Sequence, residues 1–229
     1  MLADESVLPG VDTTLLADKT AVAEAAADAI LEAATAAIAH HGLFKLCLAG
    51  GTTPTAAYAR LKDADASWQH WWIYYGDERC VPAQDGERNS LAASEAWLDH
   101  VSVPRQQVHV IPAELGAEFG ALGYEPIVWA ALPFDLVLLG IGEDGHTASL
   151  FPGREIFEDR FVMPVYAAPK PPPERVSLTL RALANSQRVL ILVTGAGKAE
   201  AVSRWRQGAD LPIARVARAA RSRVLIDQD

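Results

Sequence analysis

Four short apolar segments of the chain each end in a loop that contains glycine, and this repeated arrangement restricts the fold more than any other feature of the sequence. The loops are 50–54, 76–79, 140–146 and 194–198, and helical patterns lie between the apolar segments. Apolar strands that alternate with helices are typical of a parallel sheet with helices on both faces. We therefore expect an α/β fold with a three-layer, Rossmann-like, mainly parallel sheet flanked by helices.

The expected strands and helices cover most of the chain. Asp18 is expected to cap a long alanine-rich helix that runs to about His40, where Gly42 ends it. The other helices are expected at 54–60, about 88–100, 114–131 and 197–207, and the strands at 43–49, 71–75, 108–111, 134–139, 162–166, 176–180, 188–193 and 223–226. Without an internal repeat or a convincing linker, residues 1–229 are expected to form a single domain.

Composition excludes several classes of function. The net charge of −9 argues against nucleic-acid binding, which needs clustered Lys and Arg. No apolar run is long enough to cross a bilayer, and Met1–Gly10 carries acids where a secretory signal has basic residues. Cys47 and Cys80 form no C-x-x-C pair, which argues against a disulfide framework or a cysteine zinc site. We expect a cytoplasmic protein with neither a nucleic-acid nor a membrane partner.

The loop after the first apolar strand has the residues needed to bind a phosphate. Gly50, Gly51, Thr52 and Thr53 offer flexible backbone, amide donors and two hydroxyl groups at the start of an expected helix. A plain turn between a strand and a helix explains two glycines and a following proline equally well. Taken alone, the loop leaves both interpretations open.

The loop after the strand 134–139 matches the dinucleotide-binding pattern G-x-G-x-x-G through Gly140, Gly142 and Gly145. Its chemistry argues against a nicotinamide or flavin cofactor. Glu143 and Asp144 would place negative charge next to an anionic pyrophosphate, and such a fingerprint usually opens the chain rather than lying late in it.

The same loop suits proton transfer. A histidine titrates near neutral pH, and a carboxylate two residues before it can orient it or make it more basic. His146 is therefore the candidate general base, with Asp144 as its partner. A histidine that only packs at a helix start, beside an aspartate that interacts with the helix dipole, is the structural alternative.

Three cations lie near the ends of expected strands. Arg79, Lys198 and Arg175 could bind a phosphate, although each alone is more often a solvated charge or one half of an ion pair. The loop before Lys198 is no Walker sequence, because Leu192 and Ala199 replace the required glycine and hydroxyl residue. The chain also lacks a G-x-S-x-G elbow and an H-E-x-x-H motif, which weakens a serine-hydrolase or zinc-enzyme interpretation.

Taken together, these motifs resemble those of the 6-phosphogluconolactonase family, and the resemblance covers most of the chain. They are Leu48–Pro54, Gly76–Pro82, Asn89–Ser90, Gly140–Pro152 and Pro169–Arg175. The central block is highly specific, whereas the Gly-Gly-Thr-Thr loop is shared with relatives.

The resemblance implies hydrolysis of 6-phosphoglucono-1,5-lactone to 6-phosphogluconate, a step of the pentose phosphate pathway, without a cofactor or a metal ion. It also implies a sugar-phosphate isomerase-like fold, and a partner that is a small sugar-phosphate lactone. The sequence does not reveal the oligomeric state, for which we expect a monomer or a weak homodimer. In this interpretation His146, supported by Asp144, deprotonates the water that attacks the lactone carbonyl. The residues expected to hold the substrate are Gly50, Gly51, Thr52, Thr53, Asp77, Arg79, Gly145, Arg175 and Lys198.

Two alternatives come from different functional classes. The related glucosamine-6-phosphate deaminases share the fold and the phosphate loop, but the continuation 147–152 and the segment 77–82 resemble the lactonases instead. A catalytically silent sugar-phosphate-binding regulator would keep the phosphate loops and need no base. The intact pair of Asp144 and His146 argues against it.

Overall fold

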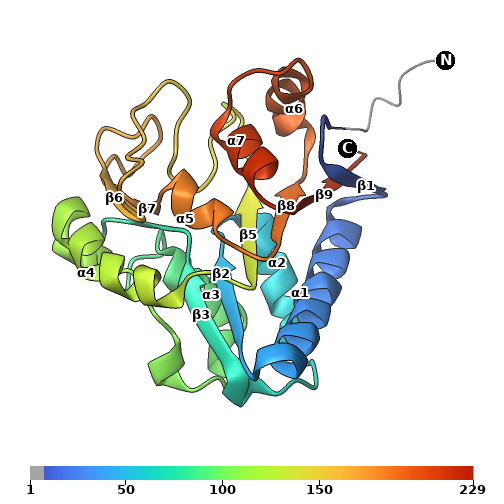
Figure 1. Ribbon diagram of the computed structural model, residues 1–229, viewed down its shortest axis with the longest axis vertical. Coiled ribbons are helices and arrows are strands. Elements are labelled where there is room, and N and C mark those ends of the chain that lie inside the picture. The colour runs from blue at the N-terminus through green and yellow to red at the C-terminus, as the bar shows by residue number, and fades with distance from the viewer. Residues whose placement is uncertain (1–7, 229) are drawn as a thin grey trace.

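The computed structural model describes residues 8–228 and has a sheet of six parallel strands at its centre (Figure 1). In their order across the sheet, the strands are β1 (Asp12–Leu16), β9 (Ser222–Asp227), β8 (Val189–Val193), β5 (Leu136–Gly140), β2 (Phe44–Leu48) and β3 (Trp71–Tyr75). The central strands β8 and β5 are almost continuously apolar and buried, as parallel strands covered on both faces must be. The expected α/β fold is confirmed.

Helices cover both faces of this sheet. They are α1 (Lys19–His41), α2 (Thr52–Leu61), α3 (Asn89–Ala96), α4 (Ala117–Ala131), α5 (Leu180–Ala184), α6 (Ala199–Arg206) and α7 (Pro212–Ala219). Contacts join α1 to α2 and α2 to α3 on one face, while α5 packs against α7 on the other (Figure 1). No helix within residues 8–228 is long and apolar enough to cross a membrane.

Helix α1 begins and ends where the sequence predicts. The Asp18 side chain accepts a hydrogen bond from the Ala21 N–H at 2.9 Å, which satisfies one of the unpaired donors of the first turn. Gly42 ends the helix in the left-handed region, at φ 88°, and its N–H donates to the Ile38 carbonyl. The buried side of α1 is mostly alanine, so the helix packs closely against the sheet.

A second, antiparallel sheet of three strands lies beside the main one. Its order is β4 (Asp77–Arg79), β7 (Arg175–Leu178) and β6 (Val162–Val165). The expectation of a loop at 76–79 is therefore wrong for its last three residues. They form a strand because β7, which lies far along the chain, pairs with them and places Arg79 opposite Arg175.

Other differences also arise from tertiary contacts. The strand expected at 108–111 is wrong, since only Val108 forms an isolated bridge, with Ile73. The helix expected at 114–131 is divided by Gly116 at φ 85° into a 3₁₀ turn and α4. The sequence did not predict β1 or α7, and the pattern of β1 is only partly buried, which weakens its apolar signal.

Candidate active site

A cavity of about 350 Å³ lies at the carboxyl ends of β2, β3, β5 and β8, where ligands of open parallel sheets bind. The loops after these strands line it together with β4, β7 and the proline-rich loop at 168–173. The polar side chains of the lining belong to Thr52, Thr53, Asp77, Arg79, Asn89, His146, Thr147, Lys170, Arg175, Thr194 and Lys198. Gly50, Gly51, Gly76, Gly140 and Gly142 also line it.

The loop after β5 folds into a tight turn that presents His146 to the cavity. The Gly142 N–H donates to the His146 carbonyl at 2.7 Å, and the Gly145 N–H donates to the Gly142 carbonyl at 2.9 Å. Gly145 has a φ of 90°, a conformation that residues with a side chain rarely adopt. These two bonds fix the position of the histidine backbone.

Asp144 holds the imidazole ring of His146. Its Oδ1 lies 2.5 Å from His146 Nδ1 and accepts a second hydrogen bond, at 3.1 Å, from the His146 backbone N–H. Burial raises the pKa of Asp144, but the donors of His146 outweigh that effect and hold the pKa below its ordinary value. An ionised carboxylate only accepts hydrogen bonds, so Nδ1 carries a proton and Nε2 is the ring nitrogen left for another partner.

Two further residues, Phe151 and Arg204, hold Asp144 and His146 in position. The ring of His146 packs against Phe151, with the ring centroids 4.8 Å apart. Nη1 of Arg204, on α6, donates to the Asp144 carbonyl at 3.1 Å and anchors the turn from its other side. The His146 side chain is left 19% exposed, so water and a ligand in the cavity can both reach it.

The loop after β2 leads directly into α2, which begins at Thr52, two residues before the predicted start. No side chain within the described residues caps its N-terminus, so the first amide donors of α2 face the cavity without a partner. Thr53 Oγ1 lies 2.5 Å from Thr194 Oγ1 and joins this loop to the end of β8. The arrangement has the donors of an anion site.

Asp77 lines the cavity, but other side chains engage its carboxylate. Ser149 Oγ donates to Oδ2 at 2.6 Å, and Asn89 Nδ2 donates to Oδ1 at 3.1 Å. A Cβ at Gly50 would lie 2.0 Å from Asn89 Oδ1, so only glycine lets the loop after β2 approach Asn89 this closely. Asp77 therefore joins the second sheet to α3 and to the segment that follows His146.

Arg79 has an unused donor. Its Nη1 donates to the Glu87 carbonyl at 2.5 Å, whereas its Nε is buried and has no partner among the described residues. A buried donor without an acceptor costs free energy, and an anion in the cavity would remove that cost.

The buried carboxylate of Glu78 sets the position of Arg79 and of α3. It accepts hydrogen bonds from the backbone N–H groups of Arg79, Asn89 and Ser90, at 2.8 to 2.9 Å. Arg88 Nε lies 3.4 Å from the same carboxylate, and both side chains are almost completely buried. This ion pair has a structural role and does not line the cavity.

Arg175 uses most of its donors to hold the proline-rich loop. Nε donates to the Pro172 carbonyl, and Nη2 donates to the carbonyls of Lys170 and Pro171, all at 3.0 to 3.1 Å. Burial lowers the pKa of Arg175, while the carboxylate of Asp77 raises it. The side chain reaches the cavity, but its geometry is that of a residue that positions the loop.

Two lysines and one glutamate lie at the cavity's rim. Burial lowers the pKa of Lys198, and the neighbouring carboxylate of Glu143 opposes this shift. Lys170, in the proline-rich loop, donates to Glu143 Oε2 at 2.9 Å, so an ion pair connects that loop to the turn of His146.

The structure brings together the residues that the sequence predicts. All of them line the cavity except Asp144 and Gly145, which support His146 from behind. Asn89, Thr147, Lys170 and Thr194 line it without having been predicted as site residues, although Asn89 and Lys170 lie in motifs of the family resemblance. Among residues 8–228, no three His, Cys, Asp or Glu side chains are grouped so that they could hold a metal ion.

Comparison with known proteins places this geometry in a family. The profile of the family described as glucosamine-6-phosphate isomerases/6-phosphogluconolactonase matches residues 17–226. The 6-phosphogluconolactonase of Mycobacterium tuberculosis is 40% identical over 210 residues, which are 84% of this chain and 85% of the relative.

Solved structures agree with this similarity. The 6-phosphogluconolactonase of Thermotoga maritima superimposes with a TM-score of 0.87 at 28% identity, over 95% of this chain and 99% of that one. A monomeric glucosamine-6-phosphate deaminase gives a TM-score of 0.82 at 22% identity, over 95% and 98% of the two chains, which shows a shared fold alone. The chain belongs to the family of glucosamine-6-phosphate isomerases and 6-phosphogluconolactonases.

Proposed function

We propose that this protein hydrolyses 6-phosphoglucono-1,5-lactone to 6-phosphogluconate by general-base activation of water. One observation carries the proposal. A histidine whose Nδ1 is held by a carboxylate shares a cavity with Arg79 and Lys198, and the buried Nε of Arg79 has no partner among the described residues. The similarity to lactonases over most of the chain supports the same substrate.

The phosphate of the substrate is held at the Gly50–Thr53 side of the cavity. The uncapped N-terminus of α2 supplies amide donors there, and the Thr52 and Thr53 hydroxyl groups are beside them. Arg79 and Lys198 supply positive charge. Because burial lowers the pKa of Lys198, a phosphate beside it favours the charged form of the lysine as well as its own binding.

The reaction begins when Nε2 of His146 takes a proton from a water molecule. The water oxygen attacks the lactone carbonyl carbon and forms a tetrahedral intermediate. That intermediate collapses by breaking the bond between the carbonyl carbon and the ring oxygen, and the proton on Nε2 passes to the departing oxygen. The Asp144 carboxylate stabilises the imidazolium between these two transfers, as in other carboxylate–histidine pairs.

We also propose that residues 1–229 form one domain. The described parts of both sheets contribute to one continuous hydrophobic cluster, and both sheets supply residues to the cavity.

A substrate test separates this proposal from the deaminase alternative. The protein is incubated with freshly generated 6-phosphogluconolactone and, separately, with glucosamine 6-phosphate, and the release of acid and of ammonia is followed. We expect acid release above the spontaneous rate and no ammonia. Ammonia release, or acid release at the spontaneous rate, would overturn the proposal.

The roles of the base and its partner are tested in the same assay. We expect His146→Ala to lower the turnover number by a factor on the order of 10² or more, and Asp144→Asn by 10² to 10⁴. The substrate should still bind. His100→Gln, a change at an exposed histidine in the 3₁₀ turn after α3, is the control. Full activity of His146→Ala would contradict the mechanism.

The phosphate site is tested through the Michaelis constant. We expect Arg79→Ala to raise this constant by about tenfold or more, because a charge-assisted hydrogen bond to the phosphate is lost. Arg105→Ala, at a side chain that is 90% exposed, is the matched control. An unchanged Michaelis constant in Arg79→Ala would remove Arg79 from the phosphate site.

A further inference from the structure

A second cavity lies at the opposite edge of the six-stranded sheet. Its lining comes from the end of α1 and from the segments that begin or precede β2, β5, β8 and β9, four neighbouring strands of the sheet. Its volume is about 520 Å³, within the range of small-molecule sites. It shares no residue with the active-site cavity.

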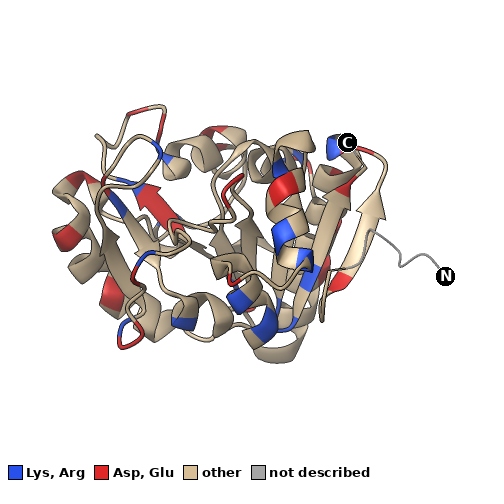
Figure 2. Ribbon diagram, turned by 90° about the horizontal axis from the view of Figure 1, so that it is seen from above, with Lys and Arg blue, Asp and Glu red and all other residues tan. Residues whose placement is uncertain are grey.

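The lining of this second cavity is positively charged. Lys45, Arg188 and Arg221 stand against one carboxylate, that of Asp135. The chain as a whole carries a net charge of −9, and acidic and basic residues occur on elements all around the molecule (Figure 2). This hollow therefore carries a local excess of cations although the chain as a whole is acidic.

The single carboxylate is already engaged. Asp135 Oδ2 accepts a hydrogen bond from the Lys45 backbone N–H at 2.8 Å, and Oδ1 lies 2.9 Å from His41 Nε2. Lys45 Nζ donates to the Ala131 carbonyl at 2.5 Å, which leaves its charge uncompensated. No acidic side chain remains in the lining to pair with the arginines.

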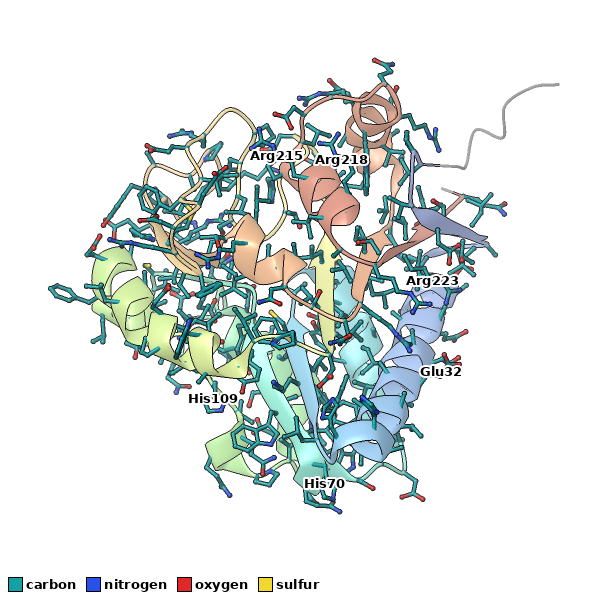
Figure 3. The ribbon with its side chains drawn as sticks, viewed as in Figure 1. Glu32, His70, His109, Arg215, Arg218 and Arg223 are labelled. Carbon is teal, nitrogen blue, oxygen red and sulfur yellow. The ribbon has the colours of Figure 1, made fainter. Side chains whose placement is uncertain are left out.

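The side chains of Arg188 and Arg221 have no partner in the part of the chain that the structure describes. Neither guanidinium forms an ion pair or a hydrogen bond with any of residues 8–228. Three arginines elsewhere in the C-terminal segment have partners: Arg215 and Arg218, on α7 in Figure 3, pair with Asp210, and Arg223 donates to Thr14.

Cations near the C-terminus of a helix also stabilise the helix itself, and α1 ends beside this cavity. The last turn of α1 already contains the basic residues His40 and His41, and the Gly42 N–H donates to the Ile38 carbonyl there. Arg188 and Arg221 come instead from the segments before β8 and β9, so the helix end does not account for them.

We propose that this cavity binds a phosphorylated organic molecule. Guanidinium groups match the oxygens of a phosphate in a bidentate geometry, and Lys45 adds a third charge. The rest of the lining includes Leu43, Pro133 and alanines of α1, which offer an apolar wall to the carbon part of the ligand. The volume exceeds what a single phosphate fills, so the ligand is a phosphate ester or a nucleotide.

The test is calorimetric titration of the full chain with pyrophosphate at low salt, because this probe carries the phosphate chemistry of both sites. We expect two bound pyrophosphate ions per chain, one in each cavity. Arg188→Gln/Arg221→Gln should retain only the active-site ion, and Arg79→Ala/Lys198→Ala should retain only the ion of the second cavity. Arg221→Gln alone should weaken the second site by about tenfold or more.

The control is Arg105→Gln/Arg218→Gln, which removes the same net charge from exposed side chains. It should still bind two ions. Arg188 and Arg221 are exposed, so their variants should fold, which circular dichroism checks. Unchanged stoichiometry and affinity in Arg188→Gln/Arg221→Gln, or an equal loss in the control, would overturn the second site. Whether Arg79→Ala/Lys198→Ala loses one pyrophosphate ion tests the active site alone. The proposed function and the second site can therefore fail independently of each other.

Discussion

The imidazole of His146 lies so close to the backbone of Gly142 that no side chain fits between them. A Cβ at position 142 would lie 2.0 Å from His146 Nδ1 and 2.7 Å from Asp144 Oδ1. Gly140, two residues earlier in the same loop, has room: a Cβ there would meet nothing closer than 3.9 Å. Position 142 therefore requires glycine to leave room for the imidazole, whereas position 140 has space for a side chain.

Gly142→Ala should therefore abolish most of the catalysis. The added methyl group must push the imidazole away from Asp144, so we expect the turnover number to fall by a factor on the order of 10². Steady-state lactonase assays measure the change, and Gly140→Ala is the matched control with nearly normal turnover. Equal turnover in the two variants would show that the ring position is not critical.

At the scale of elements, the Glu78–Arg88 pair fixes how α3 meets β4. The carboxylate satisfies the first N–H donors of α3, and the guanidinium also donates to the Ile111 carbonyl at 3.0 Å. Buried ion pairs contribute little net stability, but the removal of one partner leaves an uncompensated buried charge.

We expect Arg88→Met to lower the free energy of unfolding by about 3–5 kcal/mol, because the Glu78 carboxylate loses its counter-charge. Urea denaturation measures the effect. The double variant Glu78→Gln/Arg88→Met should regain part of the loss, since no charge is left buried. A loss below about 1 kcal/mol in Arg88→Met would mean that the carboxylate is neutral or well solvated.

His109 lies against strand β3, below α4 in Figure 3, with its ring stacked on Trp72 and Tyr74. Burial lowers the pKa of His109 below its ordinary value of about 6.5, and its Nε2 is buried without a partner in the described residues. The folded state therefore favours the neutral ring. As pH falls from 6.5 toward the folded pKa, the unfolded chain binds the proton first, so stability is lost.

We expect the urea concentration at the midpoint of unfolding to decrease when the pH is lowered from 7.5 to 5. The decrease should be smaller in His109→Phe, because phenylalanine keeps the ring stack and cannot be protonated. His70→Phe, at a partly exposed histidine in the turn before β3, is the control. The same pH dependence in His109→Phe and in the native chain would contradict this account.

At the scale of the whole molecule, the site exists only where the two sheets meet. Loops of the main sheet supply His146 and residues 50–54, and the small sheet supplies Asp77, Arg79 and Arg175. Arg175 joins them to the proline-rich loop through three carbonyl groups. This guanidinium group and the Lys170–Glu143 ion pair therefore hold the loop over the cavity.

Arg175→Lys keeps the charge but cannot reproduce three directed hydrogen bonds. We expect the loop at 168–173 to become sensitive to protease, and kcat/KM for the lactone to fall by about tenfold or more. Limited proteolysis and steady-state kinetics measure these effects, with Arg181→Lys as the control. Resistance to protease together with reduced activity would mean instead that Arg175 acts on the substrate directly.

Much of this molecule could be predicted from local sequence. Hydrophobic patterning located most of the main sheet's strands, and Asp18 and Gly42 marked the ends of α1, because capping depends only on neighbouring residues. The pairing of Asp144 with His146 could be predicted for the same reason, since two residues of one turn can meet without help from the rest of the fold.

Contacts between distant segments were decided by the tertiary structure alone. Strand β4 exists because β7 pairs with it, and neither segment signals the other in the sequence. Folding brings Asp77 within hydrogen-bonding distance of Ser149 and Asn89. It likewise brings Arg175 within hydrogen-bonding distance of the proline-rich loop. The sequence thus determined which groups can perform the chemistry, and the packing of the two sheets decided which of them remain free to contact a substrate.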